Sequence, residues 1–151
     1  MSTISNDGQM RDVIDTMDVP QQRMLAAHFI EHVLELSSDE RVQRAVHAAA
    51  NPGTDEDALN GAYKAAKAAA LEAHARCGAD GEWSDQTGYF VARAAEAAVA
   101  PQLRSHGKPP AWQAAMNCRM ARTAQASETD EDAHDSESEA QYRILNDFLT
   151  R

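Results

Sequence analysis

The chain has 151 residues, which is enough for one domain with its own hydrophobic core and too few for two domains of ordinary size. Its formal net charge of −10 works against binding nucleic acid or an anionic membrane surface, and it favours a basic protein as partner. Aromatic residues make up only 5% of the chain while Ala is abundant. Ala is the best helix former and a poor strand residue, so the composition predicts closely packed helices.

Residues 1–17 form a polar N-terminal segment that we expect to be partly ordered. One apolar set in it has the spacing of a short helix docked on the body: Met10, Val13, Ile14 and Met17. Asp18 can cap the next helix, and Pro20 suits its first turn because the missing N–H would lack a partner there anyway. We expect that helix to run to about Leu36.

Ser37 or Ser38 can cap a second helix, predicted over about residues 39–50 and stopped by the sequence Asn-Pro-Gly. A third helix is predicted over about residues 54–78. One stripe of it has helical spacing: Leu59, Ala62, Tyr63, Ala66, Ala70, Ala73 and Cys77. This stripe indicates close packing against another helix.

A fourth helix, over about residues 86–100, is almost entirely apolar, so we expect it to be central and covered on most sides. A fifth is predicted over about residues 111–126. The last begins within an acidic stretch and continues to about Thr150, with Gln141 on its apolar side, where the amide would need a buried hydrogen-bond partner. The sequence thus predicts an all-α, single-domain bundle of five to six helices over residues 18–151, with short loops and an acidic linker at 128–139.

No apolar run approaches the roughly 20 residues that span a bilayer, and the N-terminus lacks the basic-then-apolar pattern of a signal peptide. Cys77 and Cys118 have no short metal-binding spacing, so we interpret them as free thiols in a reducing compartment. Neither has the sequence context of an activated nucleophile, and both are expected to be buried small side chains. We therefore expect a cytoplasmic protein without a cofactor.

The segment from His28 to His32 contains H-x-x-E-H, the pattern with which inverted zincins bind a catalytic metal. On a helical wheel, the side opposite the apolar residues carries His28, Glu31, His32 and Glu35. A catalytic zinc needs at least three protein ligands in a shielded pocket, which this pattern does not supply. We interpret these four residues as a solvated or partner-binding edge. The candidate metal ligands are His28, Glu31 and His32. The sequence predicts no catalytic residue.

Two other patterns in the sequence bear on catalysis. A ferritin-like dimetal site needs E-x-x-H on two helices, and the sequence has it once, from Glu131 to His134. On the fourth predicted helix, Arg93 and Glu96 are three residues apart, and if buried they must be paired. We interpret them as an internal structural ion pair.

Seven acidic residues lie between Glu128 and Glu139, with His134 as the one residue that can carry a positive charge. Such a stretch is typical of a solvated linker, and its acids also suit the start of the last helix. The functional alternative is a surface that attracts a basic protein by long-range electrostatics.

The segment RMLAAHFIEHVLELSSDERVQRAVHAAANPGTDEDALNGAYKAAKAAALEAHA resembles the helical, Ala-rich immunity proteins associated with bacterial polymorphic toxin systems and related uncharacterised bacterial proteins. The closing ESEAQYRILNDFL is also similar to their ending. The acidic insert and the loop at Gly107 to Pro110 depart from the family, so no interface residue is carried over. The resemblance implies a helical, non-catalytic protein whose partner is a toxin domain.

We therefore predict a non-enzymatic protein-binding module, an immunity protein that neutralises a toxin by steric and electrostatic occlusion. The candidate partner-binding residues are His28, Glu31, His32, Glu35, Glu131, Asp132, Asp135 and Glu137. One alternative is a small metal-binding or hydrolytic helical enzyme, in which His47, His74 or an acid of the last helix joins His28 and His32. Another is a self-associating structural subunit, a homo-oligomer with an apolar patch between protomers.

Overall fold

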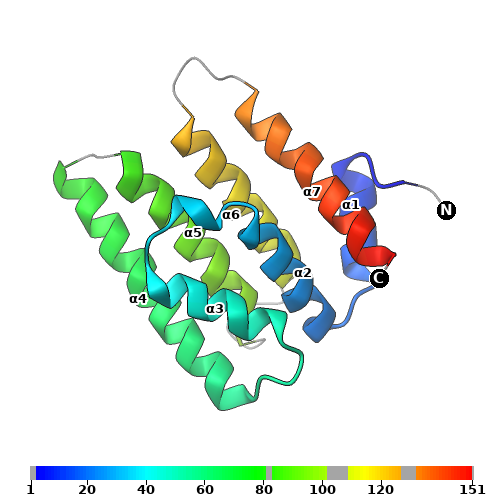
Figure 1. Cartoon of the computed structure of the whole chain (residues 1–151), viewed down its shortest axis with the longest axis horizontal. Coiled ribbons are helices and arrows are strands. Elements are labelled where there is room, and N and C mark those ends of the chain that lie inside the picture. Colours follow the sequence, from blue (N-terminus) through cyan, green and yellow to red (C-terminus); the bar gives the residue numbers. More distant parts are fainter. Residues whose placement is uncertain (1–2, 81–82, 102–108, 127–131, 151) are drawn as a thin grey trace.

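The computed structural model describes residues 3–80, 83–101, 109–126 and 132–150, and gives the backbone alone for residues 77–80 and 83–85. In this part of the chain there are seven α-helices, one 3₁₀-helix and no β-strand (Figure 1). In chain order they are α1 (Asp7–Asp15), α2 (Val19–Glu31), the 3₁₀-helix η1 (Leu34–Leu36), α3 (Glu40–Ala50), α4 (Glu56–Asp80), α5 (Trp83–Val99), α6 (Pro110–Gln125) and α7 (Ala133–Leu149). The predicted all-α class is confirmed. The predicted five to six helices were too few.

The additional helix is α1, within the segment that the sequence predicted to be only partly ordered. Its residues Met10 and Ile14 are fully buried, as their helical spacing suggested. The amide of Gln22 on α2 donates to the carbonyl of Ile14, at 3.2 Å. The N-terminal segment lies beside the end of α7 (Figure 1), where Asn146 exchanges two hydrogen bonds with the backbone of Ile4, at 2.9 and 3.1 Å. The chain's first turns are therefore docked on the helical body.

The helix α2 begins as predicted and ends earlier. The carboxylate of Asp18 accepts a hydrogen bond from the backbone of Gln21 at 2.9 Å, in a capping box with Pro20 in the first turn. The helix ends at Glu31 instead of continuing to Leu36. Val33, with φ of −116° and ψ of 6°, leaves the helical conformation, and a short 3₁₀ turn follows. Residues beyond Glu31 therefore do not follow the helical wheel drawn from the sequence.

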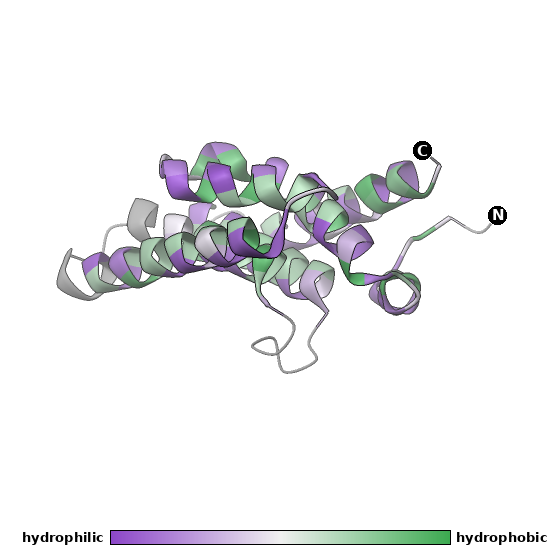
Figure 2. Ribbon diagram, turned by 90° about the horizontal axis from the view of Figure 1, so that it is seen from below, coloured by the Kyte–Doolittle hydropathy of each residue, from purple (hydrophilic) through white to green (hydrophobic). Residues whose placement is uncertain are grey.

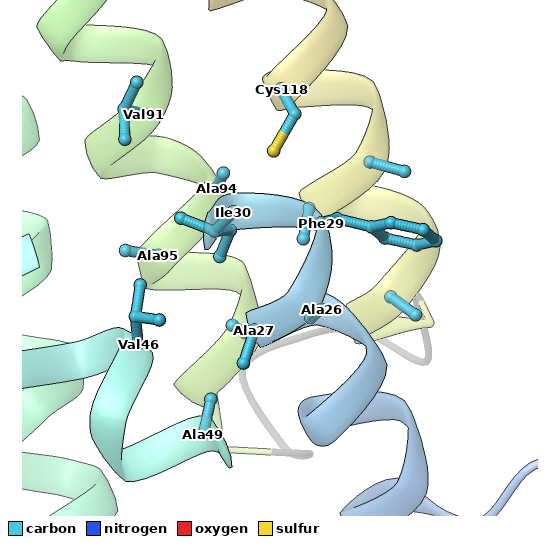
Figure 3. Packing of buried hydrophobic residues seen from close by; sticks show 14 of the residues in the cluster. Ala26, Ala27, Phe29, Ile30, Val46, Ala49, Val91, Ala94, Ala95 and Cys118 are labelled. Carbon is cyan, nitrogen blue, oxygen red and sulfur yellow. The ribbon is translucent and has the colours of Figure 1, made fainter. Parts of the chain in front are cut away.

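The hydrophobic core contains side chains from all seven α-helices, and much of it is alanine. Figure 3 shows Ala27 of α2 close to Ala49 of α3 and to α5, while Val46 of α3 points toward Ala95 of α5. Phe29 points from α2 toward α6. The helix α5 packs against α4, α6, α2 and α3, which confirms the predicted central helix. Small side chains at these contacts let the helix backbones approach closely.

Two helix starts differ from those predicted. The N-cap of α3 is Asp39, whose carboxylate accepts from the backbone of Arg41, and not Ser37 or Ser38. The helix α4 begins at Glu56, and the carboxylate of the preceding residue, Asp55, accepts a hydrogen bond from the backbone N–H of Ala58 at 2.8 Å.

The helices carry both hydrophilic and hydrophobic residues around their circumference (Figure 2). Within the described ranges, none of them has both the length and the apolar character needed to cross a membrane.

Candidate functional site

The end of α2 meets the start of α7 through His32 and Glu137. Nδ1 of His32 lies 2.9 Å from Oε2 and 3.1 Å from Oε1 of Glu137. The Glu137 side chain is only 1% exposed, and burial of a carboxylate costs free energy unless it is paired. Arg122 on α6 supplies a second partner, because its Nε donates to Oε1 of Glu137 at 3.1 Å. Glu137 thus joins three helices, α2, α6 and α7.

Arg122 also binds the end of α2. Its Nη2 donates to the backbone carbonyl of His32 at 3.1 Å, and its Nη1 lies 3.9 Å from the carboxylate of Glu35. The last carbonyls of a helix lack partners within the helix, and a cation near them is favourable. Arg122 was not among the residues selected from the sequence. Its position in α6 gave no local signal, because its partners come from two distant segments.

His28 contacts α7 at a second point. Its ring meets that of Phe148 edge to face, with the ring centroids 5.8 Å apart, and its Nδ1 lies 3.6 Å from the carboxylate of Glu31. The predicted polar edge of α2 is therefore divided. His28 and His32 face α7, while the side chains of Glu31 and Glu35 are 51% and 75% exposed.

The metal candidates are not assembled around a common point. His28 approaches Glu31, but His32 turns to Glu137, an acid of the last helix, which the metal alternative offered as a third ligand beside His47 or His74. That acid is also bound by Arg122. Across the residues that the structure describes, there is no group of three or more His, Cys, Asp or Glu side chains placed to hold a metal ion.

The acidic residues predicted to bind a partner divide in the same way. Glu137 was predicted to be on the surface, and this was wrong, because α7 turns its side chain inward to His32 and Arg122. Asp132 and Asp135 are exposed at the first turn of α7. Glu131 lies outside the described residues. Helix α7 begins at Ala133, so the second half of the predicted linker at 128–139 is helical.

Four exposed acids lie close in sequence to the two residues of the His32–Glu137 contact, and we call them the acidic face: Glu31, Glu35, Asp132 and Asp135. Both Glu35 and Glu137 approach Arg122, which places the turn after α2 beside the first turns of α7. The acidic face therefore combines both segments that the sequence had offered separately as partner-binding candidates.

A second polar cluster, which the sequence did not reveal, fixes α1 and α7 to α6. The Arg119 side chain is 2% exposed, and its guanidinium donates to both carboxylate oxygens of Asp7, at 3.0 and 2.8 Å, and to Oε1 of Gln141, at 2.8 Å. The Gln141 amide donates in turn to the carbonyl of Ala115 at 2.9 Å. The predicted need of Gln141 for a buried partner is thus confirmed. Since every member is paired inside the fold, this cluster is structural.

The Arg93–Glu96 pair and Cys118 bear on two further sequence predictions. Arg93 and Glu96 are paired at 2.8 Å, as expected, but the pair is not internal, because 47% of the Arg93 side chain is exposed. Cys118 is buried, and burial raises the pKa of its thiol well above the usual value. The side chain of Cys77 lies outside the described part.

Comparisons of the chain with protein-family models, with curated proteins and with solved structures found no significant match. The resemblance to immunity proteins therefore stays a prediction.

Proposed function

We propose that this chain is a protein-binding module without enzymatic activity, and that it binds a basic partner protein on the acidic face. The contact between His32 and Glu137 supports this most directly. It joins residues 105 positions apart and brings together the two segments that carry these acids. The net charge of −10 acts in the same direction, because it attracts a basic protein from a distance.

The surroundings of the face favour recognition of positive charge. Arg122 is a basic side chain beside it, and its Nε and Nη2 already donate to Glu137 and to the carbonyl of His32, while His134 lies 3.8 Å from the carboxylate of Asp135. Glu31, Asp132 and Asp135 remain exposed. Exposed acids held on two packed helices steer a basic partner to one orientation and mainly raise the association rate.

The partner class that fits the sequence resemblance is a toxin domain with a basic active surface. Binding a rigid helical body over such a surface would exclude the toxin's substrate without any chemistry by this chain. The acids would also occupy basic side chains that the toxin uses for an anionic substrate. Neutralisation would therefore be steric and electrostatic together.

The experiment is co-expression with a toxin-like protein encoded beside this chain's gene, followed by growth measurement and co-purification. A variant that neutralises the acidic face carries Glu31→Gln, Glu35→Gln, Asp132→Asn and Asp135→Asn. A control with the same change in net charge carries Asp12→Asn, Asp15→Asn, Asp57→Asn and Asp147→Asn, exposed acids on α1, at the start of α4 and near the end of α7.

The face variant is expected to lose protection of growth and to associate about tenfold or more slowly at low salt, while the control keeps both properties. Equal loss in the two variants would show that net charge alone matters and would refute the assignment of the face. Failure of the wild-type chain to co-purify with the toxin-like protein or to protect growth would refute the immunity function.

A further inference from the structure

A cavity of about 240 Å³ lies between η1, the start of α3, and the facing sides of α4 and α5. Its apolar wall is formed by Leu36, Val42, Ala69, Ala73 and Ala92 together with Gly88. Its polar side is formed by Glu35, Ser37, Ser38, Asp39 and Arg76. Drug-sized ligand pockets begin at roughly 300 Å³, so this cavity suits a smaller molecule.

Gly88 keeps this space open. A Cβ atom built at Gly88 would meet no atom of the described side chains within 4 Å, although the residue lies inside α5 and lines the cavity. Glycine inside a helix is less favourable than alanine, because it loses more conformational freedom on folding. By helix propensity, alanine at position 88 would therefore stabilise α5 more than glycine does. The sequence nevertheless has glycine at this position, where a larger side chain would fill the cavity.

The polar side of the cavity carries charges of both signs. The carboxylate of Asp39 accepts from Nε and Nη2 of Arg41, at 3.0 and 2.8 Å, and Arg41 also binds Glu72 at 2.6 Å. Arg76 interacts electrostatically with Asp39. Glu35 borders the cavity from the turn after α2. A ligand at this opening would meet carboxylates, a guanidinium and two serine hydroxyls beside an apolar wall.

We propose that this cavity binds a free aliphatic α-amino acid. The apolar side chain would lie against Val42, Ala73 and the open space at Gly88. The ammonium group would be bound by the carboxylate of Glu35, and the carboxylate by Arg76 and the serine hydroxyls. A zwitterion with a short apolar group is the ligand class that uses both signs of charge and the apolar wall together.

The test is a titration of the ¹⁵N-labelled full chain with L-leucine, in which the amide NMR signals of the residues lining the cavity are monitored. Saturable shifts in these signals are expected, with a dissociation constant on the order of 1 mM. Isoamylamine and isovalerate, which each carry one of the two charges, should bind at least about tenfold more weakly. Absence of saturation with L-leucine, or equal binding of either single-charge probe, would overturn the assignment.

Two variants locate the site. Gly88→Leu fills the cavity and should abolish the shifts, whereas Gly61→Leu is the matched control, since Gly61 is an exposed helical glycine whose Cβ also meets no atom within 4 Å. Arg76→Gln, at an exposed position, should weaken the binding of L-leucine more than the binding of isoamylamine. This variant tests the site if Gly88→Leu does not fold. The proposal would be refuted if a folded Gly88→Leu chain binds L-leucine. It would also be refuted if the Arg76→Gln chain prefers L-leucine over isoamylamine as strongly as the wild-type chain does.

Discussion

The carboxylate of Asp7 on α1 receives two hydrogen bonds from the buried guanidinium of Arg119 on α6, at 3.0 and 2.8 Å. The hydroxyl of Tyr142 on α7 donates to the same carboxylate at 2.8 Å. Three helices are thereby joined at one acid near the start of the chain. Because Arg119 is 2% exposed, its charge is acceptable in the core only while these partners remain.

Asp7→Asn is therefore expected to destabilise the fold more than its half-exposed position suggests. The substitution leaves the buried Arg119 without its counter-ion, and we expect the free energy of unfolding to fall by about 2 kcal/mol. Urea unfolding followed by circular dichroism measures the change. Asp12→Asn, on the exposed side of the same helix, is the control and should change stability by less than about 0.5 kcal/mol. Equal effects of the two substitutions would contradict the structural role of Asp7.

Stability should also fall in acid through two aspartates. The hydrogen bonds from Arg119 lower the pKa of Asp7, and those from Arg41 lower the pKa of Asp39, below the usual aspartate value of 3.8. Native pKa values below the unfolded value stabilise the fold above about pH 4, and this contribution is lost as the pH falls through the native values. Unfolding measured between neutral pH and about pH 3 should show the loss, with a shallower slope in Asp7→Asn. An unchanged slope would contradict the assignment to Asp7.

Glu137→Gln tests the contact between α2 and α7. Glutamine keeps the size of the side chain but removes the charge that balances Arg122, so we expect a loss of about 2 kcal/mol in the free energy of unfolding. Hydrogen exchange should show the largest loss of protection in the first turns of α7. The control is Glu139→Gln, an exposed neighbour two residues away. A Glu137→Gln chain as stable and protected as this control would show that the contact contributes nothing.

Cys118 provides a probe of global unfolding. Its side chain is fully buried, and burial raises the pKa of the thiol, so little reactive thiolate forms in the native state. In a Cys77→Ser background, modification by a disulfide reagent should be slow in buffer and should accelerate with urea in parallel with loss of helical signal. Rapid modification of the native protein would show that α6 opens locally.

Ala95→Leu tests the role of alanine at the helix contacts. Ala95 is fully buried on α5 opposite Val46 of α3 (Figure 3), so in a close-packed core three added carbon atoms must displace neighbouring side chains. Overpacking of this kind costs about 1–3 kcal/mol, which thermal or urea unfolding would detect. Ala58→Leu, at an exposed position of α4, is the matched control and should change stability little. A stable Ala95→Leu chain would show that the contact is loosely packed.

Much of the fold could be predicted because its signals are local. Asp18 and Pro20 specify the start of α2 through hydrogen bonds within one turn, and the composition limits the chain to closely packed helices. The apolar run of α5 predicted its central position. The end of α2 was less predictable, since Val33 leaves the helix inside a pattern that would also suit a longer one.

The candidate site was decided by tertiary structure. Glu137 and Asp135 belong to the same acidic stretch, yet one is buried and the other exposed, because only one of them lies on the side of α7 that faces α2 and α6. Composition cannot distinguish these sides when both carry polar residues. The sequence by itself determined that the chain is helical, acidic and rich in alanine. Which charges are paired inside the fold depends on contacts between distant helices, and one of these, between His32 and Glu137, brings together the segments that carry Glu31, Glu35, Asp132 and Asp135.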